Sequence, residues 1–153
     1  MNAQKFFYHL SHYPPRLAYG LGLGPLVGKL ILLLTTTGRK SGLARVTPLQ
    51  YEEIGQVFYV AAAHGLKADW VCNLQANPHV SVRVGSRQFN GETKIIGDPE
   101  QIARYLDYRL QRHPRMIGFI LRQDGLSATP DMVQLNEYAK KLVLVCITPE
   151  SNP

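Results

Sequence analysis

Residues 32–45, LLLTTTGRKSGLAR, carry the most information about how this chain folds. The apolar run predicts a largely buried strand over Lys29 to Thr36, and the glycines at 38 and 42 predict a tight turn after it. Residues 44–53 and 56–63 are rich in Val, Tyr and Phe and flank Ile54-Gly55, which predicts a β-hairpin. This part of the chain is therefore expected to form antiparallel sheet.

The turn has the composition of an anion-binding loop. Arg39, Lys40 and Ser41 form its centre, Gly42 ends it, and Arg45 follows shortly after. Backbone amides in a tight turn make a concavity that attracts anions, and hydroxyls and guanidinium groups donate to phosphate oxygens. A solvated hairpin turn with cations that only aid solubility is the alternative, and the residues alone leave both open. The spacing is that of neither a P-loop nor a dinucleotide fingerprint.

The rest of the chain alternates short strands and helices. Strands are expected over residues 79–84, 87–96 and 141–148, and helices over 3–11, 68–75, 98–112, 115–123 and 130–138. Asp98-Pro99 is a helix-start signal, and Asn77-Pro78 and His113-Pro114 end helices. Long crossovers between strands are absent. We therefore expect one domain over residues 1–153, mainly β (α+β): a small barrel of about six antiparallel strands with flanking helices.

The net charge of the chain indicates which kinds of partner it could bind. The chain of 153 residues has a formal net charge of +6, which favours phosphorylated cofactors, nucleic acid or an acidic membrane surface. The arginines form only a loose cluster at positions 104, 109, 112, 115 and 122, and no nucleic-acid recognition motif accompanies them. Nucleic acid is therefore not expected as a partner.

Metal binding and membrane spanning are not expected either. The two cysteines and five histidines show no ligand spacing. The apolar stretch Leu17 to Leu34 is interrupted by Lys29, Pro25 and glycines, so it is no spanning helix. We expect a cytoplasmic protein, in which the aromatic N-terminus (Phe6 to Tyr8, Tyr13) either packs on the barrel or attaches loosely to a membrane.

Motifs in order along the chain resemble those of the deazaflavin-dependent nitroreductase family. They are Thr36-Thr37-Gly38-Arg39-Lys40-Ser41-Gly42 followed by Arg45 and Pro48-Leu49, then Val60-Ala61-Ala62, Gly65, Trp70 and Asn73 to Pro78. The similarity covers about half of the chain. It implies a split β-barrel and a reduced 8-hydroxy-5-deazaflavin coenzyme, F420, that donates hydride to a quinone, a nitro compound or an activated alkene. Catalytic side chains are not expected, because such a coenzyme supplies the chemistry.

The resemblance also implies residue roles. Arg39, Lys40, Ser41 and Gly42 would bind the phosphate and glutamate tail of the coenzyme, with Arg45 in support and Lys67 as a further cation. The flat ring of the coenzyme would be lined by Pro48, Ala61, Ala62, Ala63 and His64. Trp70 is either a core anchor or a ring-stacking residue.

The chain departs from the family pattern around the acceptor. Ala63 stands where family nitroreductases have a serine, and residues 129–135 lack the tyrosines that shape their acceptor pocket. Tyr108, Met132 and Tyr138 are our candidates for that pocket. Two alternatives stay open: the same barrel with FMN in place of F420, and a carrier or anionic-lipid-binding module that is not an enzyme. The expected partner is a small-molecule electron acceptor, and the chain is expected to be a monomer or a homodimer.

Overall fold

The computed structural model describes residues 31–127 and 129–151. The helix expected over Ala3 to Ser11, the aromatic N-terminus and the start of the first predicted strand lie outside the described residues.

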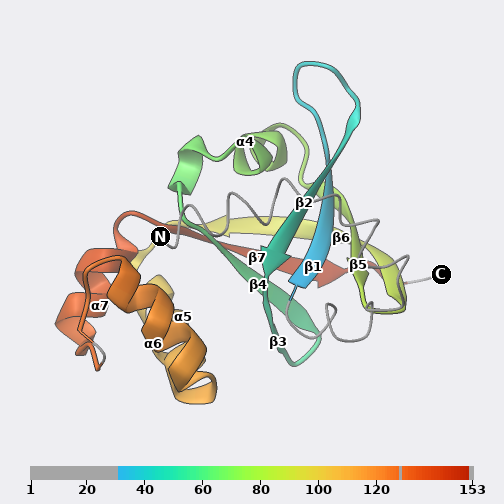
Figure 1. Ribbon diagram of the computed structural model, residues 1–153. Coiled ribbons are helices and arrows are strands. Elements are labelled where there is room, and N and C mark those ends of the chain that lie inside the picture. Colours follow the sequence, from blue (N-terminus) through green and yellow to red (C-terminus); the bar gives the residue numbers. More distant parts are fainter. Residues whose placement is uncertain (1–30, 128, 152–153) are drawn as a thin grey trace.

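A single antiparallel sheet of seven strands organises the described chain, in the order β2-β1-β5-β6-β7-β4-β3 (Figure 1). The strands are β1 (Ile31–Thr37), β2 (Ala44–Gln50), β3 (Glu52–Ile54), β4 (Val57–Ala62), β5 (His79–Val84), β6 (Arg87–Ile96) and β7 (Val143–Pro149). The sequence predicted about six antiparallel strands, and the seventh comes from the division of one of them. Its strand over 44–53 divides at Tyr51, because β2 pairs with β1 whereas β3 pairs with β4 at the opposite edge.

The sheet curls on itself around one apolar core. Leu32 and Leu34 of β1 share a buried cluster with Phe58 and Val60 of β4, although three strands separate β1 from β4 in the sheet. Only a strongly curved sheet brings such distant strands into contact. This architecture agrees with the expected split barrel.

Three helices cover the outside of the curl, on the left of Figure 1. They are α5 (Pro99–Arg112), α6 (Pro114–Gln123) and α7 (Met132–Ala139), and their buried residues pack against Leu144 of β7 and Tyr59 and Ala61 of β4. The side chain of Asp98 accepts a hydrogen bond from the backbone N–H of Glu100, which confirms the predicted helix start.

The β1–β2 hairpin extends beyond the rest of the sheet. β1 pairs with β5 only over Leu33 to Thr35, whereas it pairs with β2 along its whole length. The end of the hairpin therefore projects as an arm (Figure 1). Helix α4 (Asp69–Ala76) follows a short 3-10 helix (η1, Gly65–Lys67) and lies beside this arm.

Candidate functional site

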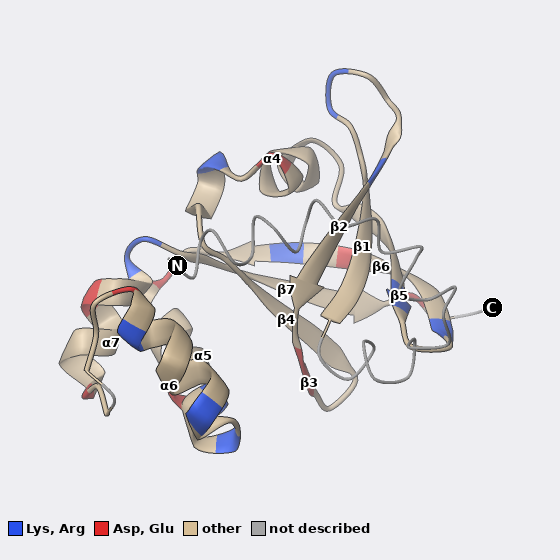
Figure 2. Cartoon of the chain, viewed as in Figure 1, with Lys and Arg blue, Asp and Glu red and all other residues tan. Residues whose placement is uncertain are grey.

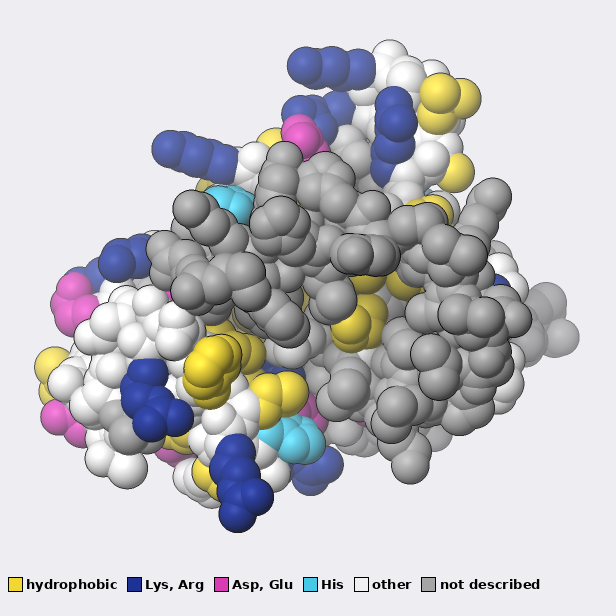
Figure 3. Space-filling view, in the orientation of Figure 1, with side chains coloured by type: hydrophobic (Ala, Val, Ile, Leu, Met, Phe, Trp, Pro, Cys, Tyr) yellow, Lys and Arg dark blue, Asp and Glu magenta, His cyan; other side chains and the backbone are white. Residues whose placement is uncertain are grey.

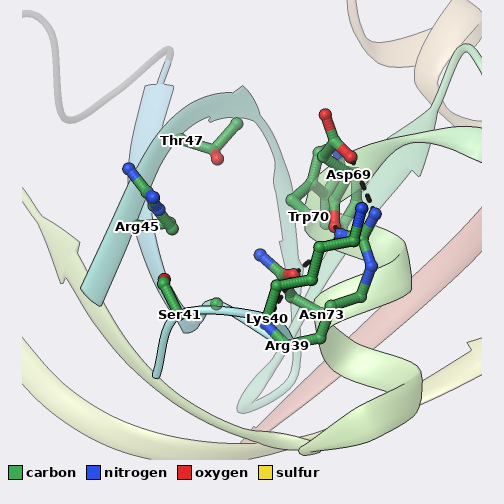
Figure 4. Close-up of a pocket in the computed structure, with 9 residues that line it drawn as sticks. Arg39, Lys40, Ser41, Arg45, Thr47, Asp69, Trp70 and Asn73 are labelled. Atoms are coloured by element: carbon green, nitrogen blue, oxygen red, sulfur yellow. Dashed lines mark hydrogen bonds and ion pairs between the residues drawn. The ribbon is translucent and has the colours of Figure 1, made fainter. Parts of the chain in front are cut away.

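A pocket of about 400 Å³ lies between the arm and helix α4 (Figure 4). Figure 4 shows Arg45 and Thr47 of β2 on one side and residues of α4 on the other. The pocket is lined by Gly38, Arg39, Lys40, Ser41, Arg45, Thr47, Asp69, Trp70 and Asn73. Three cationic side chains and one carboxylate therefore surround it.

The loop of the arm is fastened to α4 through a buried asparagine. Oδ1 of Asn73 accepts a hydrogen bond from the backbone N–H of Arg39 at 3.2 Å and another from its Nη1 at 3.0 Å. Nδ2 of the same carboxamide donates to Oγ1 of Thr36, which is also buried, at 3.1 Å. Since all three contacts join segments more than thirty residues apart, they fix the loop relative to the helix.

The guanidinium of Arg39 also forms an ion pair and a hydrogen bond with Asp69. Nη2 of Arg39 lies 3.1 Å from Oδ1 of Asp69, and Nη1 donates to the backbone carbonyl of Asp69 at 3.3 Å. Because the Asp69 side chain is 91% exposed, water screens this ion pair and its contribution to stability is small. Arg39 thus acts first as a link between loop and helix.

The turn itself is closed by its own hydrogen bonds. The amide of Gly38 donates to the carbonyl of Leu43, that of Gly42 to the carbonyl of Gly38, and that of Leu43 to Oγ of Ser41. A Cβ atom at Gly38 would lie 2.7 Å from Oγ of Ser41 and 3.2 Å from the carbonyl oxygen of Leu43, so a larger residue there would displace the Ser41 side chain. Within the described chain, the backbone amides of Lys40 and Ser41 make no such bond.

Lys40 and Arg45 are the two pocket cations without an ion pair in the described part of the chain. Both are exposed, and neither forms an ion pair with any described residue. Arg45 stands opposite Thr36 in the β1–β2 register, so its side chain lies on the same face of the hairpin as Thr36. Figure 2 shows Lys and Arg residues at the arm and few Asp or Glu residues around it. The arrangement suits a ligand with negative charge.

Five of the residues predicted to bind the coenzyme line the pocket and the other seven do not. Arg39, Lys40, Ser41, Arg45 and Trp70 line the pocket; the residues outside its lining are Gly42, Pro48, Ala61, Ala62, Ala63, His64 and Lys67. Trp70 is half-buried and also packs against the core, so it is core anchor and pocket wall at once.

The two neighbouring alanines of the predicted ring wall point to opposite faces of β4. Ala62 is buried against Val71 and Val143, whereas Ala61 packs against the helices on the other face of the sheet. Neighbouring residues of a strand point to opposite faces, so a ring lying against β4 would contact the side chain of only one of these two alanines. The predicted ring wall stays a prediction. Ala63 and His64 are exposed just beyond the end of β4.

The three candidates for an acceptor pocket lie on the helical layer and not at this cavity. Tyr108 of α5 lies under the guanidinium of Arg112, Met132 begins α7 and is 41% exposed, and the hydroxyl of Tyr138 donates to Oδ2 of Asp124 at 2.6 Å. Their role in binding an acceptor stays a prediction.

Sequence reasoning missed several residues that line the pocket, namely Gly38, Thr47, Asp69 and Asn73. Asn73 belongs to one of the motifs that carry the family resemblance but received no role. The signal that could have found it is its helical position beside Trp70 and Leu74, where a polar residue on a buried face requires a partner. Among the described residues, no group of His, Cys, Asp and Glu could hold a metal ion, and no helix is long and apolar enough to cross a membrane.

A curled antiparallel sheet with a cationic pocket at a projecting hairpin is the architecture of a split-barrel protein. The family model described as F420H(2)-dependent quinone reductase matches residues 18–122, and the chain belongs to this family. It is similar to the F420H(2)-dependent quinone reductase Rv1261c of Mycobacterium tuberculosis, with 38% identity over 68 residues. That match covers 42% of this chain and 46% of the relative, so the chain spans about half the length of the curated relatives it matches.

Solved structures of low sequence identity support the fold. The F420-H2 dependent reductase FDR-A is 23% identical with a TM-score of 0.52, over 78% of this chain and 94% of that one. HutZ, a heme storage protein of Vibrio cholerae, is 17% identical with a TM-score of 0.55, over 90% and 92% of the two chains. Since proteins with different ligands share this fold, the ligand has to be argued from the pocket.

Proposed function

We propose that the protein is a reductase that binds reduced F420 and transfers hydride to a quinone-like small molecule. The observation that carries this proposal is the pair of pocket cations, Lys40 and Arg45, which have no acidic partner among the described residues. Membership of the quinone reductase family supports the choice of coenzyme.

The donors of the pocket fit the anionic end of this coenzyme, which has a phosphodiester and a glutamate tail. Lys40 supplies an ammonium group, Arg45 a planar guanidinium, and Ser41 and Thr47 hydroxyls. A charge-assisted hydrogen bond is worth roughly 1.5–3 kcal/mol, so three or four of them suit micromolar affinity. FMN has a phosphate but no such tail and would leave part of this donor set unused.

The coenzyme supplies a hydride when bound, and the chain supplies position and surroundings. Lys40 and Arg45 would hold the charged end at the arm, and Asn73 would keep the arm at a fixed place beside α4. Trp70 offers an apolar wall within the same pocket. The pocket's carboxylate, Asp69, is already bound to Arg39, so we assign delivery of a proton to the acceptor to water.

The acceptor and the assembly state belong to the same proposal. Nitro compounds and activated alkenes stay among the acceptors to screen, and Tyr108, Met132 and Tyr138 stay candidates for contacting them. We propose that residues 1–153 form one cofactor-binding domain that works as a monomer or a homodimer. A solved structure that is 23% identical to this chain, with a TM-score of 0.52, is described as a domain-swapped dimer.

Fluorescence titration of the protein with F420 and separately with FMN tests the coenzyme. We expect F420 to bind more tightly, and Lys40→Ala and Arg45→Ala each to weaken it about tenfold or more, as loss of one charge-assisted bond should. Lys140→Ala is the matched control, because Lys140 is an exposed lysine at the end of α7 that pairs with Glu137. An acceptor screen with reduced F420 follows.

If FMN bound more tightly than F420, the assignment of F420 as the coenzyme would be wrong. Equal affinity of the Lys40→Ala, Arg45→Ala and control proteins would show that the arm is only a solvated turn. Binding of F420 without turnover of any quinone, nitro compound or alkene would favour a carrier over an enzyme.

A further inference from the structure

Helix α6 turns an aromatic side chain outward between two arginines. Ile117 and Leu121 are buried in the cluster under the helices, which fixes the inner face of α6. Phe119 is 54% exposed, whereas the phenylalanines at 58 and 89 pack in or against the core of the barrel. Arg115 and Arg122 stand four residues before and three after Phe119, so all three share the outer face.

This face is also free of acidic side chains. Residues 114–123 contain no Asp or Glu. Asp124, just after the helix, accepts a hydrogen bond from the hydroxyl of Tyr138. Arg115 makes no ion pair with a described residue, and Arg122 only donates through Nε to the carbonyl of its own helix at Gly118. Figure 3 shows Lys or Arg side chains beside hydrophobic side chains in the part of the surface where α6 lies.

The other arginines of the loose sequence cluster are committed elsewhere. Arg104 pairs with Glu100 on α5, and Arg109 is buried against Glu52. Arg112 lies 3.5 Å from the same carboxylate and stacks on Tyr108. Three arginines of the cluster are therefore paired with described carboxylates, and the other two flank Phe119.

We propose that the outer face of α6, formed by Arg115, Phe119 and Arg122, rests on a bilayer that contains anionic lipid. Arginines beside an exposed aromatic ring match the two layers of such a surface, since guanidinium groups pair with phosphate headgroups while the ring enters the apolar boundary. Because α6 is already formed and packed, docking orders no new backbone. The surface lies outside the coenzyme pocket, so it stands or falls independently of the proposed function.

An acidic protein is the competing partner, and the shape of the face favours lipid. The outer face is a single helix with one protruding ring, and such a surface is convex. Specific protein interfaces place their aromatic anchors in complementary pockets over an area of several hundred Å². A fluid bilayer accepts a small convex face without such complementarity.

Co-sedimentation of the full chain with vesicles tests the proposal. One set is phosphatidylcholine alone, and the other also contains phosphatidylglycerol. We expect binding to the anionic set only, reduced by salt, with Arg115→Gln and Arg122→Gln each weakening partitioning about fivefold and Phe119→Ser about tenfold. Arg104→Gln is the matched control, because it removes the same charge from a paired, exposed arginine on α5.

Thermal unfolding of each variant shows that loss of binding is not loss of fold. The proposal is overturned if the protein ignores anionic vesicles, or if Arg104→Gln weakens binding as much as Arg115→Gln does. It is also overturned if the protein binds polyglutamate but no vesicle, since that result would assign the face to an acidic protein.

Discussion

Asn73 of α4 holds Arg39 of the arm at two points, because its Oδ1 accepts from both the backbone N–H and Nη1 of that residue. Arg39, which the sequence predicted to bind the coenzyme, is therefore hydrogen-bonded to another side chain of the protein. A loop fixed in this way presents Lys40 to the pocket without an ordering cost when a ligand arrives.

Asn73→Ala is expected to weaken coenzyme binding by releasing the arm, because the Asn73 carboxamide is bonded to Arg39 and Thr36. The change leaves the backbone amide of Arg39 and the buried hydroxyl of Thr36 without a partner, which costs about 1–3 kcal/mol of stability. Urea unfolding measures the stability, and fluorescence titration measures the affinity.

The matched control for this change is Asn136→Ala. Asn136 lies on α7, and its Nδ2 donates to the carbonyl of Met132. The Asn136→Ala protein should lose some stability and keep its affinity for the coenzyme. If both variants bound the coenzyme as the unmodified protein does, the contact between Asn73 and the arm would have no role in binding.

Asp69→Asn is expected to tighten the binding of an anionic coenzyme by a few fold. The change removes the negative charge that lines the pocket and leaves the guanidinium of Arg39 able to turn toward the ligand. The gain should shrink as salt is raised, because Asp69 is exposed. Titrations at low and high salt measure both effects, and weaker binding at low salt would mean that Arg39 must stay on Asp69.

Glu52→Gln is expected to destabilise the fold strongly. Glu52 and Arg109 are both buried, with Nε of Arg109 3.2 Å from Oε1, so the change leaves a buried charge without its partner. Loss of one member of a buried pair typically costs about 3–5 kcal/mol. Urea unfolding measures it, with Glu100→Gln at the exposed pair with Arg104 as the control, where less than about 1 kcal/mol is expected. If both variants lost a similar free energy of unfolding, the pair of Glu52 and Arg109 would not contribute to stability as a buried ion pair.

Stability is expected to fall at alkaline pH because of Tyr105 and Tyr138. Burial raises the pKa of both phenols, and for Tyr138 the hydrogen bond to Asp124 raises it further. The unfolded chain therefore releases these protons near the ordinary tyrosine pKa of about 10 while the folded chain retains them, so the stabilisation is complete below pH 10 and is lost above it.

Unfolding of the Tyr138→Phe protein checks this pH dependence. It should be less stable by about 1 kcal/mol at neutral pH, from the lost hydrogen bond, and its stability should fall less steeply above pH 10. The same slope in both proteins would show that Tyr138 ionises as freely in the folded chain as in the unfolded one.

Local patterns predicted much of the fold. Alternation placed Val80, Val82 and Val84 on one face of β5, and all three are buried. The bounds of β5 and β6 were predicted to the residue, since turn signals at Asn77-Pro78 and Gly85-Ser86 delimit them. The same alternation would have shown that Ala61 and Ala62 face opposite ways.

The sequence by itself determined the antiparallel class, the helix starts and the cationic composition of the arm, because these depend on residues close together in the chain. Tertiary structure alone decided that the strand over 44–53 divides between two edges of the sheet. It also decided that Arg39 is held by Asn73, whereas Lys40 and Arg45 line the pocket without an ion pair to any described residue. Which partner a side chain takes depends on what the curled sheet brings beside it, and residues distant in sequence compete for that contact only after the chain has folded.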